Sequence, residues 1–254
     1  MKRLITSNAF VYTAGLIFVF ALWCLISFSR GEGSFIFPSP FATFEFAFTL
    51  LGKPYFYQCI GATLLRTLEG FGYAFILAAT FGSLAGAIKP LQRFFKPLML
   101  VLKSAPTAAF VFVFLIISGS TRAPIWIVGL LAFPILYESF VAGINAVPKE
   151  IKWATRVDQA SFMSSLLKIK IPLAFPYVAL GILNSFALSF KTEIMAEIIT
   201  GSTDPGLGGY IRMFKNENPT DLTPIFAIAL VAIVIILLVD LLTFGFKKLH
   251  EKLG

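Results

Sequence analysis

The sequence predicts an all-α polytopic membrane protein with six transmembrane helices. Of its 254 residues, 57% are hydrophobic and only 13% are charged, and the mean hydropathy is +0.85. A soluble domain is about one quarter charged, so this chain lacks the charged residues that a water-facing surface needs. Several of its apolar runs reach about 20 residues, the length at which a helix crosses the hydrocarbon core. The same composition excludes an intrinsically disordered chain.

The first half of the chain contains three of the expected spans. An apolar run over 9–28 follows the basic N-terminus, and it is too long for the core of a signal peptide. After a loop and an amphipathic stretch, the second span covers 70–88 and ends at Pro90, since proline cannot continue a helix. The third span covers 97–117, and Pro106 within it predicts a kink.

The second half contains the other three spans. The fourth covers 125–144. A long polar segment, 145–171, separates it from the fifth, which covers 172–190 and is expected to continue as a helix beyond that point. The sixth covers 225–246. We expect the whole chain, residues 1–254, to form a single transmembrane domain.

Basic residues are distributed unequally between alternate loops, and this inequality predicts the orientation. With the N-terminus inside, the inside segments hold thirteen basic and three acidic residues, whereas the outside segments hold six basic residues. Lys and Arg concentrate in the cytoplasmic loops of membrane proteins, so we expect both termini in the cytoplasm. The basic residues assigned to the inside are Lys2, Arg3, Lys89, Arg93, Lys96, Lys149, Lys152, Arg156, Lys168, Lys170, Lys247, Lys248 and Lys252.

The net charge and the few reactive residues argue against several classes of function. Orientation accounts for the net charge of +8, so we expect contacts with membrane lipid and no nucleic-acid partner. Cys24 and Cys59 lie far apart and the single histidine is His250, which excludes a metal site and a Cys/His nucleophile. The chain also lacks a glycine-rich phosphate-binding loop with its lysine, so we expect neither a cofactor bound by this chain nor enzymatic activity.

The cytoplasmic segment 145–171 is too long for a simple turn between two helices. Its spacing leaves two interpretations open. The segment lies on the headgroups, with Lys168 and Lys170 bound to anionic lipid, or it presents a short helix to a groove in a soluble partner.

A polar stripe marks the outer end of the fifth span. Its members recur every four residues and therefore share one face of a helix. Carboxylates at membrane depth usually face a wet cavity or a partner, so we favour a stripe that lines a translocation pathway; the alternative is a helix that has already left the membrane. The expected pathway residues are Ser185, Ser189, Glu193 and Glu197, together with Asn184 on a neighbouring face.

Other polar features have simpler expected roles. Arg66 and Glu69 lie three residues apart and are expected to form an interfacial ion pair. Lys103 is expected to reach toward the headgroups, and Glu138 requires a partner or a cavity that the sequence does not identify. The glycine-rich stretch 201–209 is expected to be a flexible turn.

Two sets of residues resemble a known family, the permeases of binding-protein-dependent ABC importers. The cytoplasmic segment resembles their EAA loop (Glu-Ala-Ala, three residues, Gly, nine residues, Ile-x-Leu-Pro). Ala154, Ile169 and Pro172 match this pattern, whereas Gln159 stands in place of the glycine and Trp153 in place of the glutamate. Nitrate/sulfonate/taurine-type permeases also share three further segments: Phe37-Pro38-Ser39-Pro40, Lys191 to Gly201, and Gly206-Leu207-Gly208.

This resemblance implies a type I ABC importer transmembrane-domain fold in a bacterial inner membrane. It implies two cytoplasmic ATPase subunits that bind ATP and Mg²⁺, an extracytoplasmic solute-binding protein, and a second permease copy, for which we expect a homodimer rather than a heterodimer. Segment 145–171 would contain the coupling helix that sits in a groove of the ATPase. The coupling residues that the resemblance implies are Trp153, Ala154, Thr155, Arg156, Val157, Asp158, Gln159, Ala160 and Ser161.

The resemblance implies a permease subunit that forms the pathway for a small solute. Solutes of this subfamily include sulfonates, nitrate and vitamin precursors, and carboxylates on the lining would favour a neutral or cationic solute unless Lys191 compensates. Two alternatives are an ion-coupled secondary transporter, although no internal repeat is evident, and the transmembrane component of an energy-coupling-factor vitamin importer, whose paired Ala-Arg-Gly-type motifs are missing from the sequence.

Overall fold

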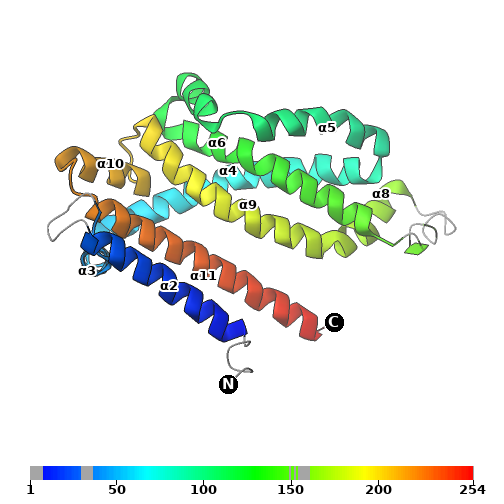
Figure 1. The fold of residues 1–254 in the computed structure, drawn as a ribbon. Coiled ribbons are helices and arrows are strands. Elements are labelled where there is room, and N and C mark those ends of the chain that lie inside the picture. Colours follow the sequence, from blue (N-terminus) through cyan, green and yellow to red (C-terminus); the bar gives the residue numbers. More distant parts are fainter. Residues whose placement is uncertain (1–7, 30–36, 149, 152, 154–160, 254) are drawn as a thin grey trace. The chain divides into compact units, whose positions relative to one another are not determined.

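The computed structural model describes residues 8–29, 37–148, 150, 151, 153 and 161–253, and all regular secondary structure among them is helical (Figure 1). The all-helical prediction is therefore confirmed. The helices are α2 (Asn8–Ser29), α3 (Pro40–Leu51), α4 (Pro54–Ala87), α5 (Lys89–Ser104), α6 (Thr107–Ala146), α8 (Phe162–Ser165), a π-helical turn η1 (Leu166–Lys170), α9 (Ile171–Thr200), α10 (Leu207–Glu217) and α11 (Thr223–Leu253).

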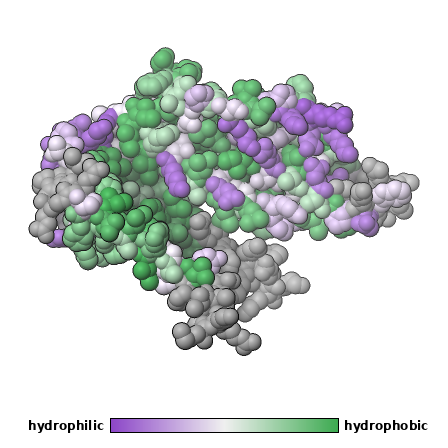
Figure 2. Space-filling model, viewed as in Figure 1, coloured by the Kyte–Doolittle hydropathy of each residue, from purple (hydrophilic) through white to green (hydrophobic). Residues whose placement is uncertain are grey.

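Within this described part, four helical stretches are long and apolar enough to cross a membrane: Val11–Ser29, Pro54–Ala87, Thr107–Ala146 and Phe162–Thr200. They overlap the predicted first, second, fourth and fifth spans. Two further apolar helical stretches, Pro40–Leu51 and Thr223–Val239, are shorter. The surface agrees with a lipid environment, because many large apolar side chains are exposed and apolar residues cover much of the face shown in Figure 2.

The third predicted span is wrong as a single helix. Helix α5 ends at Ser104, Ala105 is extended (ψ 139°), and α6 begins at Thr107. Pro106 lacks an N–H group and disfavours a helical residue before it, so it ends the helix instead of kinking it. The predicted boundary before the fourth span does occur, because α6 breaks at Gly119 (φ 76°, ψ 172°), a conformation that a side chain would strain.

The chain divides into two compact units, and the smaller one comprises residues 1–57 and 210–237. In this unit Trp23 Nε1 donates a hydrogen bond to the carbonyl oxygen of Pro38 (3.1 Å), and the Phe226 ring packs on Trp23 and Phe37. Ser39 caps α3 by accepting a hydrogen bond from the Ala42 N–H. The Pro-Ser-Pro segment thus ends the loop and starts the next helix.

The larger unit comprises residues 58–209 and 238–254. Helices α6 and α9 pack along each other (Figure 1), with α4 and α5 against α6. The core contains Ala78 of α4, Leu136 and Phe140 of α6, and Ala174 of α9. Small residues allow the helix backbones to approach, which is the usual packing mode within membranes.

A substitution at Gly82 of α4 would test this packing. A Cβ atom there would lie 2.8 Å from Phe140 Cβ and 3.0 Å from the Tyr137 carbonyl oxygen, whereas a Cβ atom at Gly72 would meet nothing within 4 Å. We expect Gly82→Ala to destabilise the protein by about 1–3 kcal/mol through overpacking. Gly72→Ala, the matched control, is expected to be neutral or slightly stabilising. Thermal unfolding in detergent measures both, and equal midpoints for the two variants would contradict the packing argument.

Candidate functional site

The polar stripe of α9 lies on one buried face of the helix. The exposed fractions of Ser185, Ser189, Glu193 and Glu197 are 0%, 2%, 0% and 1%. Ser189 Oγ donates to the Ser185 carbonyl oxygen (2.7 Å), so this hydroxyl is satisfied within the helix. Asn184 lies on the exposed face of α9 instead. The carboxylates are therefore packed inside this chain and need a partner there.

That partner is Arg66 of α4, whose side chain is 13% exposed. Its Nε donates to Glu193 Oε1 (3.1 Å), and an Nη donates to Glu197 Oε1 (2.5 Å). Thr63, one turn earlier on α4, donates to the Glu197 carboxylate (2.9 Å to Oε1). We call Thr63, Arg66, Glu193 and Glu197 the α4–α9 polar cluster. It holds two carboxyl groups against one guanidinium group.

The N-terminus of α10 supplies the additional positive potential. The Gly208 N–H donates to Glu197 Oε2 (2.7 Å), and the Leu207 N–H donates to Thr63 Oγ1 (2.9 Å). Both amides belong to the first turn of α10, where unpaired N–H groups and the helix dipole favour an anion. Arg66 also donates to the Pro205 carbonyl oxygen (2.7 Å). The polar cluster therefore ties α4, α9 and the start of α10 together.

Two expectations from the sequence are corrected here. Arg66 does not pair with Glu69, because Glu69 accepts a hydrogen bond from Tyr73 (2.8 Å) and Arg66 reaches α9. The stretch 201–209 is also not simply a flexible turn. Gly201 ends α9 in the left-handed conformation (φ 71°), and a Cβ atom on Gly208 would lie 2.6 Å from Glu197 Cβ. Gly208 is required by the close approach of the start of α10 to α9, and Gly201 by its left-handed backbone conformation.

The expected coupling residues lie mostly outside the described residues: Ala154, Thr155, Arg156, Val157, Asp158, Gln159 and Ala160 are not part of the described structure. Trp153 is helical and its side chain is 70% exposed. Ser161 caps α8 by accepting a hydrogen bond from the Ser164 N–H (3.2 Å). Phe162 and Met163 follow with exposed apolar side chains.

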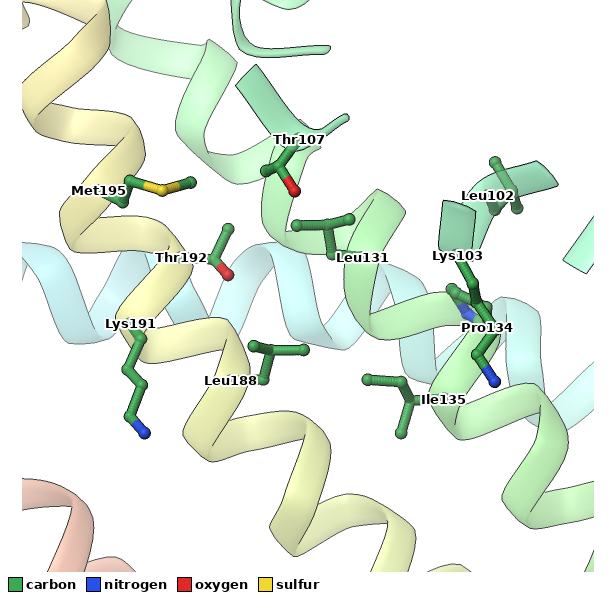
Figure 3. A pocket seen from close by; sticks show the side chains of 10 residues that line it. All are labelled: Leu102, Lys103, Thr107, Leu131, Pro134, Ile135, Leu188, Lys191, Thr192 and Met195. Carbon is green, nitrogen blue, oxygen red and sulfur yellow. The ribbon is translucent and has the colours of Figure 1, made fainter. Parts of the chain in front are cut away.

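A separate cavity of 440 Å³ lies beside the exposed face of α9 (Figure 3). Four of its lining residues come from α9: Leu188, Lys191, Met195 and Thr192, which adds a hydroxyl group. Helices α5 and α6 form the opposite wall. All the lining residues are Leu102, Lys103, Thr107, Leu131, Pro134, Ile135, Leu188, Lys191, Thr192 and Met195.

The two charged residues that line this cavity, Lys103 and Lys191, are both basic. Lys103 Nζ forms an ion pair with Glu138 (2.6 Å), which identifies the partner that the sequence left open for Glu138. Lys191 takes part in no ion pair among the described residues. In Figure 3 the two ammonium groups lie at opposite ends of the group of labelled side chains, with Leu188 and Ile135 between them. Neither Glu193 nor Glu197 lines the cavity.

Comparison with protein families gives one match over most of the chain. The family described as "Binding-protein-dependent transport system inner membrane component" matches residues 76–252. Two solved structures share the fold: an inward-facing MetNI methionine ABC transporter (TM-score 0.67, 15% identity, 76% of this chain and 95% of that chain) and an amino acid ABC transporter with histidines (TM-score 0.64, 19% identity, 77% and 94%).

Two curated proteins that are similar to this chain are permease proteins. The bicarbonate transport system permease protein CmpB of Synechococcus elongatus is 29% identical over 170 residues, which are 66% of this chain and 60% of CmpB. The nitrate import permease protein NrtB of Synechocystis sp. is 27% identical over 219 residues, 82% of this chain and 76% of that protein. The match with CmpB thus spans less than two thirds of its length.

Proposed function

Because the chain belongs to the family of binding-protein-dependent transport system inner membrane components, we propose that it is the permease subunit of an ATP-driven importer. The single observation that carries this proposal is the family match over residues 76–252, which includes the segment between α6 and α9. Two copies of the chain would form the pathway, and an extracytoplasmic binding protein would deliver the solute to it.

We place this subunit in a bacterial inner membrane with six spans and both termini in the cytoplasm. The excess of basic residues in the assigned inside segments supports this orientation. Exposed Lys89, Arg93 and Lys96 at the start of α5 belong to one of these segments, and hydrophilic side chains gather over that end of α5 (Figure 2). The four long apolar stretches overlap the first, second, fourth and fifth of these spans, and α11 covers the sixth, 225–246; the third, 97–117, is shared by α5 and the start of α6.

Residues 153–161 would couple the pathway to two cytoplasmic ATPase subunits, which bind ATP and Mg²⁺. Exposed apolar side chains lie at its start (Trp153) and directly after it (Phe162 and Met163), and they suit docking into a groove of a soluble partner. Closure of the ATPases on ATP would then shift the population between inward-facing and outward-facing states.

The transported solute is proposed to be a small inorganic oxyanion. The relatives named above are permeases for bicarbonate and nitrate. The argument for a neutral or cationic solute rested on Glu193 and Glu197 lining the pathway, but these carboxylates are buried against Arg66. The charged groups that line the described cavity are lysines.

The rival functions differ in their source of energy. An ion-coupled secondary transporter would work without ATPase subunits, and the fold shared with two ABC transporters argues against it. An energy-coupling-factor component would also use ATPases, but it would not need the binding-protein-dependent family pattern that spans residues 76–252.

Transport by the reconstituted complex distinguishes these functions. We expect nitrate or bicarbonate uptake into liposomes to require ATP and Mg²⁺ on the ATPase side and a loaded binding protein on the other. A proton or sodium gradient alone is expected to drive no uptake. Uptake driven by an ion gradient without ATP would overturn the proposal, as would a purified chain that retains no ATPase subunit under conditions that preserve its fold.

A further inference from the structure

We propose that the cavity between α5, α6 and α9 is a binding site for a small inorganic oxyanion in transit, with Lys191 as its charged ligand-binding residue. This inference rests on the proposed function and deepens it, because it assigns the recognition of the solute to named residues of the permease. The size of the cavity, its polar groups and the separation of charges around α9 support this assignment.

The cavity has the size and composition of a small-molecule site. Its volume of 440 Å³ falls within the range of about 300–1,000 Å³ that is usual for ligand pockets. Apolar side chains form most of its lining, and four of the ten lining residues are polar. Such sites combine an apolar wall with a few polar groups that orient the ligand.

Lys191 is the feature that needs a ligand. It is the only basic residue of α9, a helix of 30 residues, and its side chain is exposed on the same face as Leu188 and Met195. Lys191 lies within the apolar stretch Phe162–Thr200, where an ammonium group is costly and normally faces a partner or a wet cavity. The other lysine of the cavity is compensated by Glu138. Lys191 therefore leaves the cavity with an excess positive charge.

Two threonines can complete the recognition of an oxyanion. Thr107 begins α6 and Thr192 follows Lys191 on α9, and both line the cavity (Figure 3). Each hydroxyl group can donate one hydrogen bond. Thr107 is also the first residue of α6, and the preceding Pro106 gives that helix no side-chain cap. The positive end of α6 therefore adds to the potential that Lys191 creates.

The arrangement of α9 keeps negative charge away from this site. Residues 191 and 193 are two positions apart, which places their side chains about 200° apart around a helix. Lys191 consequently lies beside the cavity, whereas Glu193 and Glu197 face Arg66 and the start of α10. The two carboxylates that would repel an anion are neutralised on the far face of the same helix.

The test uses the complete transporter with its ATPase subunits and binding protein in liposomes, with nitrate and bicarbonate as the probes. We expect Lys191→Gln to lower the maximal uptake rate at saturating loaded binding protein by about tenfold or more, since a charge-assisted contact is lost. The thermal midpoint is expected to stay unchanged, because Lys191 takes part in no ion pair among the described residues. Lys191→Arg is expected to retain at least about half of the rate, because it keeps the charge.

Lys215→Gln provides the matched control, since it removes an exposed lysine of α10 that does not line the cavity. A Lys191→Gln rate equal to that of this control would overturn the inference. So would a Lys191→Arg variant as defective as Lys191→Gln, because the charge would then not be the cause. If either result were found while the wild type still showed ATP-driven uptake, only the inference about Lys191 would fail. If the wild type showed no ATP-driven uptake, the proposed function itself would be rejected.

Discussion

Arg66→Ala is expected to destabilise the protein by about 3–5 kcal/mol, the usual cost of breaking a buried ion pair by removing one partner. The arginine side chain is 13% exposed, and the two carboxylates that it binds are 0% and 1% exposed. Without the guanidinium group, Glu197 would keep Thr63 and the Gly208 N–H as donors, whereas Glu193 would lose the donor that the described residues give it. Such an effect is a large fraction of the total stability of a typical protein.

The geometry explains why a lysine at position 66 would replace Arg66 only in part. Its Nε and an Nη reach two different carboxylates, and the same Nη also binds the Pro205 carbonyl oxygen. Lysine carries one compact ammonium group without this fork. We therefore expect Arg66→Lys to recover only part of the stability that Arg66→Ala loses.

The thermal midpoint of the purified protein in detergent measures this effect. Arg122→Ala is the control, because it removes an exposed arginine of the same unit and is expected to change the midpoint little. The triple variant Arg66→Met, Glu193→Gln, Glu197→Gln is expected to be more stable than Arg66→Ala, because it removes the unpaired charges as well. An Arg66→Ala midpoint that matches the Arg122→Ala midpoint would show that the polar cluster contributes nothing to stability.

Replacing both Ala154 and Arg156 with glutamate is expected to abolish ATP-driven uptake, with a reduction of more than about a hundredfold. We propose that these residues belong to the segment that docks into the ATPase groove, where two added carboxylates would introduce repulsion and a desolvation cost. Because the proposed contact would transmit the ATP-driven motion to the pathway, its loss is expected to stop transport even when each subunit is folded.

Co-purification and uptake measure this second effect. We expect the ATPase subunits to dissociate from the variant during purification while its thermal midpoint stays close to that of the wild type. The control introduces two carboxylates elsewhere, as Arg122→Glu with Lys215→Glu, both at exposed positions. A variant that keeps its ATPase subunits and its uptake would remove residues 153–161 from the coupling role.

The helices of this chain could be predicted well from local sequence. A helix in hydrocarbon must satisfy its backbone hydrogen bonds internally, so long apolar runs identify helices almost without regard to the remainder of the chain. Pro106 and Gly119 show where this reasoning was incomplete and where it succeeded. The proline ended α5 instead of kinking one long span, and the polar stretch around Gly119 did contain a break.

The candidate site could be predicted only in part. The four-residue spacing correctly placed Ser185, Ser189, Glu193 and Glu197 on one face of α9, because helical geometry is local. The partner of the two carboxylates was missed, since the nearest acid to Arg66 in sequence was Glu69. A usable signal was present: an arginine within one apolar helix and two acids within another require compensation at membrane depth.

The sequence by itself thus determined that this protein is helical and membrane-embedded, and its motifs indicated the permease family. Hydropathy and backbone hydrogen bonding act over a few turns of chain, so these properties can be read locally. The tertiary structure decided that Arg66 binds Glu193 across 127 residues and that Lys191 lies beside a cavity. Such contacts depend on how α4, α6 and α9 pack, and the strength of a buried charge pair depends on the burial that this packing creates.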